Sequence, residues 1–141
     1  MNRIKILLVG QPNVGKSSLL NAIVGSKVIV SNYPGTTVEL SKAKKKIEDT
    51  EIEFIDTPGI YSLSHKSEEE KITERTLFKE KIDGAVVVID STALERGLYT
   101  ALQILEAEIP VVVALNFVEE AEKKGIKIDI DKLKKFLNVP V

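Results

Sequence analysis

Eight residues near the N-terminus constrain this 141-residue chain more than any other feature: Gly10-Gln11-Pro12-Asn13-Val14-Gly15-Lys16-Ser17. They fit the pattern G-x-x-x-x-G-K-[ST], in which a glycine-rich turn joins a strand to a helix. The flanking residues supply both elements. The apolar run Ile4–Val9 predicts a buried strand, and Ser17–Val24 carries apolar residues at helical spacing before Gly25. The pattern therefore predicts a strand, a phosphate-binding turn and a helix, in that order.

The residue types in this turn suit the binding of a polyphosphate. Glycines such as Gly10 and Gly15 let backbone N–H groups converge without Cβ clashes, and the following helix N-terminus adds positive potential. Lys16 is expected to bridge the β- and γ-phosphates, and the Ser17 hydroxyl is expected to bind Mg²⁺. A structural turn alone would not explain a Lys-Ser pair at its exit. The remaining residues expected to line the site are Asn13, Val14 and Ser18.

The rest of the chain alternates predicted strands with predicted helices. Ser26–Glu39 is expected to be a loop, because it contains Asn, Pro and Gly turn residues. The other predicted strands are Leu40–Glu48, Glu51–Asp56, Ala85–Asp90 and Pro110–Leu115, and Val139–Val141 resembles the start of another. The other predicted helices are Glu68–Lys81, Leu94–Ala107, Phe117–Lys124 and Asp131–Leu137, the last with Asp131 as its cap. This alternation predicts one α/β domain over residues 1–141, with a mostly parallel sheet, one antiparallel edge strand and helices on both faces.

Composition and charge exclude several classes of protein. The formal net charge is -1, so no broad basic surface and no nucleic-acid partner are expected. There is no cysteine, which excludes disulfides, thiolate metal sites and thiol nucleophiles. No apolar run approaches the ~20 residues that a membrane-spanning helix needs. The lysines of Leu40–Glu48 favour a solvated edge strand, protected from mispairing, over an anion-binding patch. The chain is therefore expected to be a cytosolic domain.

A second motif, Asp56-Thr57-Pro58-Gly59, follows a predicted strand. A carboxylate at that strand end stands where a second contact to Mg²⁺ is needed, so Asp56 is expected to hold the metal through water. The N–H of Gly59 is expected to meet the γ-phosphate. Alone, this tetrapeptide is equally compatible with a simple turn. Its occurrence together with the glycine-rich turn favours the metal site.

Thr37, in the predicted loop, is expected to complete the phosphate site. A loop hydroxyl that closes on Mg²⁺ and the γ-phosphate makes a switch, because its contact disappears after hydrolysis. The adjacent Thr36 competes for this role, and motif spacing favours Thr37.

Asn116-Phe117-Val118-Glu119 follows the last predicted strand and approximates the N-x-x-D pattern of guanine-binding domains. Asn116 is expected to support the base and its loop, and Glu119 is expected to accept hydrogen bonds from the guanine edge. Such a pocket rejects adenine because buried acceptors would then stay unpaired. The longer side chain of Glu119 leaves the strength of selectivity open, and the alternative is a solvent-facing Glu at a helix start.

With these elements in order, the chain resembles the translation-factor-related class of small GTPases, and more closely the cytoplasmic G domain of ferrous iron transport protein B. The matching stretches cover nearly the whole chain and are Gly10–Leu20, Asn32–Glu39, Asp56–Leu63, Glu70–Arg75, Asp90–Leu105 and Gly125–Val141. The resemblance implies a P-loop GTPase fold that binds GTP and GDP and slowly hydrolyses GTP, coupled to Fe²⁺ uptake. It also implies a membrane-embedded iron-permease region elsewhere in a larger protein, at the cytoplasmic face of the cell membrane.

The resemblance assigns further roles to single residues. Asn13 is expected to bind a K⁺ ion that bridges the phosphates, in place of an arginine finger that is worth ~10³–10⁵ in rate. The expected catalytic set is Asn13, Lys16, Thr37 and Gly59. Ile60 stands where Ras-like proteins have a catalytic Gln, and an alkyl side chain does not orient water, so slow intrinsic turnover is expected.

Two departures from the family pattern bear on function. Glu119 replaces the usual Asp, and Val141 precedes the final strand, the base-contacting loop and the last helix, so we expect a shortened domain with weaker nucleotide affinity. A ribosome- or RNA-associated GTPase and a nucleotide-binding module with negligible hydrolysis are the alternatives, and oligomerisation is compatible with the sequence. His65 lies in a predicted loop, and a solvated histidine is favoured there over a catalytic or iron-sensing group. Tyr33 either covers the nucleotide or packs its own loop, and Arg96 is expected to be a surface charge.

Overall fold

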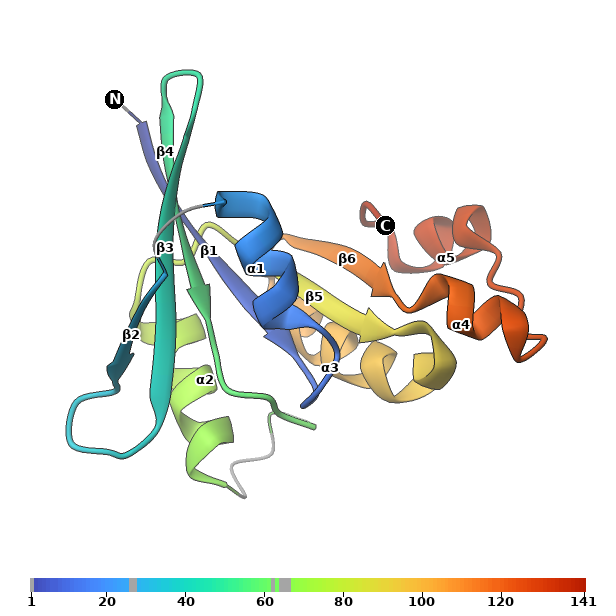
Figure 1. Ribbon diagram of the computed structural model, residues 1–141, viewed down its shortest axis with the longest axis horizontal. Coiled ribbons are helices and arrows are strands. Elements are labelled where there is room, and N and C mark those ends of the chain that lie inside the picture. The colour runs from blue at the N-terminus through green and yellow to red at the C-terminus, as the bar shows by residue number, and fades with distance from the viewer. Residues whose placement is uncertain (1, 26–27, 62, 64–66) are drawn as a thin grey trace.

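A mixed six-stranded sheet forms the centre of the computed structural model, which describes residues 2–25, 28–61, 63 and 67–141. The sheet order is β2-β3-β4-β1-β5-β6 (Figure 1). The strands are β1 (Asn2–Gly10), β2 (Ile29–Asn32), β3 (Glu39–Ile47), β4 (Thr50–Asp56), β5 (Gly84–Asp90) and β6 (Val111–Asn116). Strands β4, β1, β5 and β6 run parallel, whereas β3 runs antiparallel to both β2 and β4. The predicted α/β fold with a mostly parallel sheet is confirmed.

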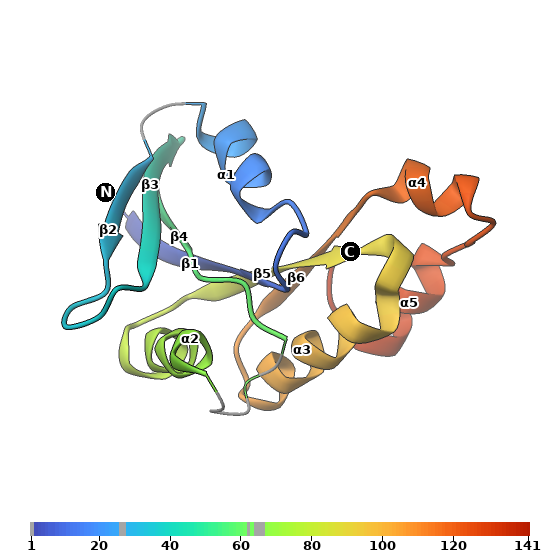
Figure 2. The ribbon, with the colours of Figure 1, turned by 60° about the horizontal axis from the view of Figure 1, so that its bottom comes forward.

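Helices cover both faces of this sheet, as predicted. Helix α1 lies on one face, and α2 and α3 lie on the other, while α4 and α5 follow β6 (Figure 2). Their bounds are α1 (Lys16–Val24), α2 (Glu68–Lys79), α3 (Leu94–Glu106), α4 (Val118–Lys123) and α5 (Ile130–Leu137), and a short 3₁₀ turn, Ser91–Ala93, precedes α3. No helix among the described residues is long and apolar enough to cross a membrane.

The two-residue period of the central strand β1 places its side chains in two different clusters of the core. Leu7 and Val9 of β1 pack on the face with α3, where Ile104 is fully buried. Leu8 points the other way and packs with Leu20 of α1. Successive side chains of a strand point to opposite faces, so β1 contributes to both clusters. The core therefore holds the ends of β1 and α1 rigidly, and these are the ends that the glycine-rich turn connects.

The structure corrects several predicted boundaries. The predicted loop Ser26–Glu39 contains strand β2, which pairs with Glu39–Lys42 at the edge of the sheet. All four β2 residues are exposed, and the apolar run Val28–Val30 is short and followed by Asn, Pro and Gly turn residues, which favoured a loop. Helix α5 is capped by Asp129, whose side chain accepts from the N–H of Lys132, and not by Asp131. Helix α2 ends two residues early because Glu80 is extended.

One lysine of the lysine-rich strand β3 makes a specific hydrogen bond to helix α1. Lys45 Nζ donates to the carbonyl oxygen of Ile23, 2.6 Å away, near the C-terminus of α1. Gly25 ends that helix in the left-handed conformation, as its position suggested. At the C-terminal end of the chain, the N–H of Val113 in β6 donates to the carbonyl of Pro140 at 2.9 Å. The residues predicted to start another strand therefore lie beside β6.

Candidate nucleotide-binding site

Three predicted motif residues meet at one edge of the sheet because each is the last residue of its strand. Gly10 ends β1, Asp56 ends β4 and Asn116 ends β6. These strands are parallel, so their carboxyl ends reach the same edge, where ligands of open α/β sheets bind. The fold thereby brings together motifs that lie more than a hundred residues apart in the sequence.

The glycine-rich turn has no room for side chains at its two glycines. A Cβ on Gly10 would lie 2.7 Å from the carbonyl oxygen of Val88. Gly15 has φ 94°, and a Cβ there would collide with Nδ2 of Asn116. Asn13 also has a positive φ of 65° and is exposed. The turn thus lies directly against the neighbouring strand ends, which leaves its outer side for a ligand.

Lys16 and Ser17 both point at Asp56 from the first turn of α1. The Lys16 ammonium donates to the carbonyl oxygen of Thr57 at 2.9 Å and lies 3.4 Å from Asp56 Oδ1. The Ser17 hydroxyl donates to Asp56 Oδ2 at 3.0 Å. The side chains of Lys16 and Asp56 are only 10% and 7% exposed, so this ion pair is largely shielded from solvent. The three residues assigned to phosphate and metal binding are therefore adjacent.

The oxygen atoms at this point fit a hard divalent cation. Asp56 Oδ1 is buried and accepts no hydrogen bond from the described residues, with the Lys16 ammonium as its charged neighbour. A carboxylate beside a hydroxyl offers the oxygen ligands that Mg²⁺ takes, and Mg²⁺ usually keeps several waters and binds through few protein groups. The described residues contain no group of three or more His, Cys, Asp or Glu that could hold a metal ion.

Asn116 connects the predicted base-binding motif to the glycine-rich turn. Its Nδ2 donates to the Val14 carbonyl oxygen at 3.0 Å, and its Oδ1 accepts from the Phe117 N–H at 2.9 Å. Phe117 has φ 57°, so the chain reverses sharply before α4 begins. Glu119 is exposed in the first turn of α4. The Asn side chain therefore supports the turn, whereas the Glu carboxylate remains available to a ligand.

A cavity of about 460 Å³ opens over the turn. It is lined by Gln11, Asn13, Val14, Gly15, Lys16, Ser17, Ser18, Asn116 and Phe117. Sequence reasoning missed Gln11, which the pattern treats as variable, and Phe117, although an aromatic residue beside Asn116 was a signal. Five of the predicted site residues do not line this cavity: Gly10, Thr37, Asp56, Gly59 and Glu119. The loop that carries Thr37 joins β2 to β3 and extends away from the turn (Figure 1).

Hydrogen bonding distinguishes the two competing threonines. The Thr36 hydroxyl donates to the Tyr33 carbonyl oxygen at 2.9 Å and accepts from the Val38 N–H at 3.1 Å. Thr37 is exposed. Thr36 therefore stabilises its own turn, and Thr37 is the better placed of the two to contact a ligand. Tyr33 packs against the small cluster that includes Val38, and His65 lies outside the described residues.

The segment after Asp56 is fastened to β1 and the turn. The Thr57 hydroxyl donates to the Leu8 carbonyl oxygen at 2.8 Å, and the Ile60 N–H donates to the Gly10 carbonyl oxygen at 2.9 Å. A Cβ on Gly59 would lie 2.6 Å from Cα of Pro12. The Ile60 side chain is 2% exposed and belongs to the core, so this segment is anchored by both its backbone and an apolar side chain.

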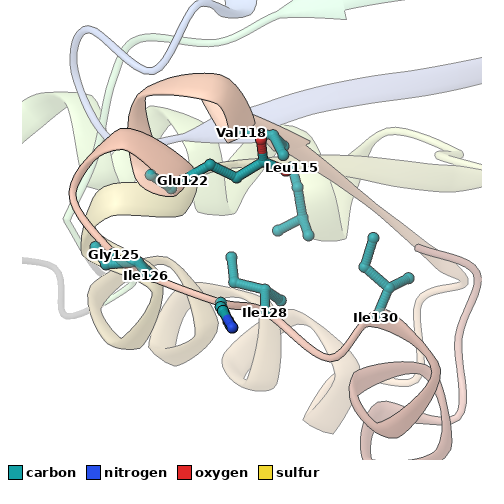
Figure 3. A pocket seen from close by; sticks show the side chains of 9 residues that line it. Leu115, Val118, Glu122, Gly125, Ile126, Ile128 and Ile130 are labelled. Atoms are coloured by element: carbon teal, nitrogen blue, oxygen red, sulfur yellow. The ribbon is translucent and has the colours of Figure 1, made fainter.

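Another cavity, of about 290 Å³, lies between α4 and the segment that leads to α5 (Figure 3). Its lining is mostly apolar and includes Leu115, Val118, Ile126, Ile128 and Ile130. None of the predicted phosphate-binding residues lines it. The cavity over the turn is the candidate nucleotide site because Lys16, Ser17 and Asn116 line it together.

Residues 4–141 match the family model described as ferrous iron transport protein B. The chain is 46% identical over 129 residues to Fe(2+) transporter FeoB of Campylobacter jejuni, covering 92% of this chain and 21% of that protein. It is 44% identical over 139 residues to Fe(2+) transporter FeoB of Helicobacter pylori, covering 99% and 22%. The chain thus spans about a fifth of the length of these curated relatives.

Solved structures that resemble this chain also come from FeoB transporters. The G domain of the T. maritima FeoB iron transporter superposes with a TM-score of 0.91 at 42% identity, covering 99% of this chain and 86% of that one. The cytosolic domain of the same transporter in a GDP form has a TM-score of 0.93 at 44% identity, covering 99% and 55%. Its GMPPNP form has a TM-score of 0.91 at 44% identity, covering 98% and 55%.

Proposed function

This chain belongs to the ferrous iron transport protein B family, and we propose that it binds GTP and GDP and hydrolyses GTP slowly. The observation that carries the proposal is the convergence of Lys16 and Ser17 on buried Asp56 beside the glycine-rich turn. Relatives of the same fold, at 44% identity, are described in GDP and GMPPNP forms. A cavity lined by that turn, at the carboxyl edge of the sheet, suits the phosphates of such a nucleotide.

In this proposal the turn binds the nucleotide through its backbone and one ammonium group. Gly10, Val14 and Gly15 would present backbone N–H groups to the phosphates, and Val14 and Gly15 line the cavity. The N-terminus of α1 would add its dipole, with Ser18 in that first turn. Lys16 exchanges its present partners, Asp56 and the Thr57 carbonyl oxygen, for phosphate oxygens. The charge of a triphosphate is thereby neutralised where water is largely excluded.

Ser17 and Asp56 are the residues that would hold Mg²⁺, and Thr37 would join them when its loop closes. The metal would supply neutralisation of phosphate charge. Asn13 is the proposed ligand for K⁺, because it is exposed and lines the cavity beside Lys16. Closing of the Thr37 loop depends on the γ-phosphate, so this loop would report whether GTP or GDP is bound.

Hydrolysis in this chain must depend on backbone groups and cations, since Ile60 is buried in the core. The Gly59 N–H is proposed to contact the γ-phosphate, and its close approach to Pro12 places it beside the turn. A preorganised N–H stabilises charge that develops in the transition state. We therefore propose a slow enzyme, with Lys16, Asn13, Thr37 and Gly59 as its catalytic groups.

Guanine is the proposed base. Asn116 supports the turn through Val14, and Glu119 is exposed one helical turn further on, with its carboxylate available to the N–H groups of guanine. Fluorescent GDP is expected to bind far more tightly than fluorescent ADP in Mg²⁺ buffer, and Glu119→Gln is expected to reduce that difference. Equal affinities for the two nucleotides would refute the roles given to Asn116 and Glu119.

For the whole protein, we propose that this G domain regulates Fe²⁺ transport by a membrane-embedded region and lies at the cytoplasmic face of the membrane. The proposal rests on relatives that are Fe(2+) transporters and about five times longer than this chain. A nucleotide-binding module with negligible hydrolysis is the second candidate, favoured by the burial of Ile60. Single-turnover GTP cleavage in K⁺ and Na⁺ buffers separates the two, because the module would cleave GTP in neither.

A further inference from the structure

Helix α3 makes two hydrogen bonds to the segment that leaves Asp56, which we call the tethered segment (residues 57–61 and 63). The Thr100 hydroxyl donates to the Tyr61 carbonyl oxygen at 3.1 Å. Oε1 of Gln103 accepts from the Leu63 N–H at 2.9 Å. The chain leaving β4 runs toward α3 in Figure 2, in agreement with these bonds. Neither α3 residue belongs to the motifs described above.

The hydrogen bonds of these two side chains run to a segment outside their own helix. Thr100 and Gln103 are three residues apart, so both project from one face of α3. Threonine is a poor helix former, and a buried helical threonine commonly bonds to its own helix, as the Thr76 hydroxyl does with the Ile72 carbonyl oxygen. Thr100 is 1% exposed, yet its hydroxyl donates to a segment 39 residues away in sequence.

The tethered segment is thus held at both ends. Toward Asp56 it is bonded to β1 through Thr57 and Ile60. Toward α2 it is bonded to α3 through the carbonyl of Tyr61 and the N–H of Leu63. Gly59 lies between these anchors and packs on Pro12. Ile60 is buried, so in the proposed function the group of this segment that contacts the γ-phosphate is the backbone N–H of Gly59. The position of this backbone relative to the glycine-rich turn would then decide how well it stabilises the transition state.

We propose that Thr100 and Gln103 are positioning residues that hold the tethered segment against the glycine-rich turn and thereby set the rate of GTP hydrolysis. This inference rests on the proposed GTPase function and adds to it residues outside every nucleotide-binding motif. Neither residue lines the cavity over the turn. They should therefore affect the cleavage step and leave GDP affinity unchanged.

The test uses the full chain and two variant pairs. Thr100→Val and Gln103→Met remove one tether each, whereas Thr100→Ser and Gln103→Glu keep the hydroxyl and the acceptor oxygen. Thr76→Val is the matched control, because it removes a buried helical hydroxyl whose bond stays within α2. Two readouts are measured: hydrogen exchange in the peptide that covers the tethered segment, and single-turnover GTP cleavage beside the Kd for fluorescent GDP.

Each tether-removing variant is expected to speed exchange in the tethered segment and to slow cleavage about threefold to tenfold, the range that one hydrogen bond supplies. GDP affinity is expected to stay within about twofold, since the variants touch no nucleotide contact. The conservative variants and Thr76→Val should retain wild-type exchange and cleavage. Unchanged exchange, or unchanged cleavage, in both tether-removing variants would overturn the inference. If the wild-type protein cleaves no GTP, the proposed function fails. Hydrogen exchange in the tethered segment then decides by itself whether Thr100 and Gln103 hold that segment in place.

Discussion

The contact between Gly15 and Asn116 makes Gly15→Ala an informative perturbation. Alanine at φ 94° would bear a left-handed backbone cost of about 1–2 kcal/mol. Its Cβ would also displace the Asn116 amide, which donates to the Val14 carbonyl oxygen and accepts from the Phe117 N–H. These two bonds contribute about 1 kcal/mol each. The free energy of unfolding is therefore expected to fall by about 3–4 kcal/mol, by the sum of these estimates.

Gly25→Ala is the matched control for this prediction. Gly25 also has a positive φ, 56°, but a Cβ there would meet nothing within 4 Å. It should lose only the backbone term, about 1–2 kcal/mol. Urea unfolding followed by far-ultraviolet circular dichroism, extrapolated to water, measures both variants. Fluorescent GDP binding should weaken for Gly15→Ala alone.

A double variant tests the cause directly. Asn116→Ala removes the group that Gly15→Ala would displace, so the two losses should be less than additive when combined. Equal losses of stability for Gly15→Ala and Gly25→Ala, or full additivity with Asn116→Ala, would refute the reasoning that the turn and the base motif are coupled through this contact.

Three further predictions concern single groups of the site. Lys16→Ala should abolish triphosphate binding in calorimetry. It should also lower the free energy of unfolding, because buried Asp56 loses its counter-charge, and adding Asp56→Asn should restore part of that stability. Gly59→Ala should slow GTP cleavage and spare GDP affinity, since its Cβ would push the segment off Pro12; unchanged cleavage would count against this contact. Thr37→Ala should reduce the preference for GMPPNP over GDP, whereas Thr36→Ala should chiefly destabilise its own turn in urea unfolding.

Local sequence patterns were sufficient where local chemistry decides structure. The glycine-rich turn, the strand before it and the helix after it follow from glycine spacing and apolar periodicity. The buried strand β5 and helix α1, ending at Gly25, were predicted for the same reason. The choice of Thr37 over Thr36 came from motif spacing and stays a prediction, whereas the hydrogen bonds of the Thr36 hydroxyl within its own turn are seen only in the structure.

Tertiary contacts decided the rest. Strand β2 is exposed and is defined by its pairing with β3, which no local periodicity reveals. The start of α5 depended on which of two aspartates reached the Lys132 N–H.

The amino-acid sequence by itself determined which groups can bind a polyphosphate, because a backbone turn with glycines, an ammonium and a hydroxyl is encoded in eight consecutive residues. Only the tertiary structure decided how those groups are coupled to the rest of the chain. The pairing of Asn116 with Val14, and of Thr100 with Tyr61, joins residues 102 and 39 positions apart. Such contacts depend on the order of parallel strands and on which helix face meets which segment, and these are properties of the packed sheet.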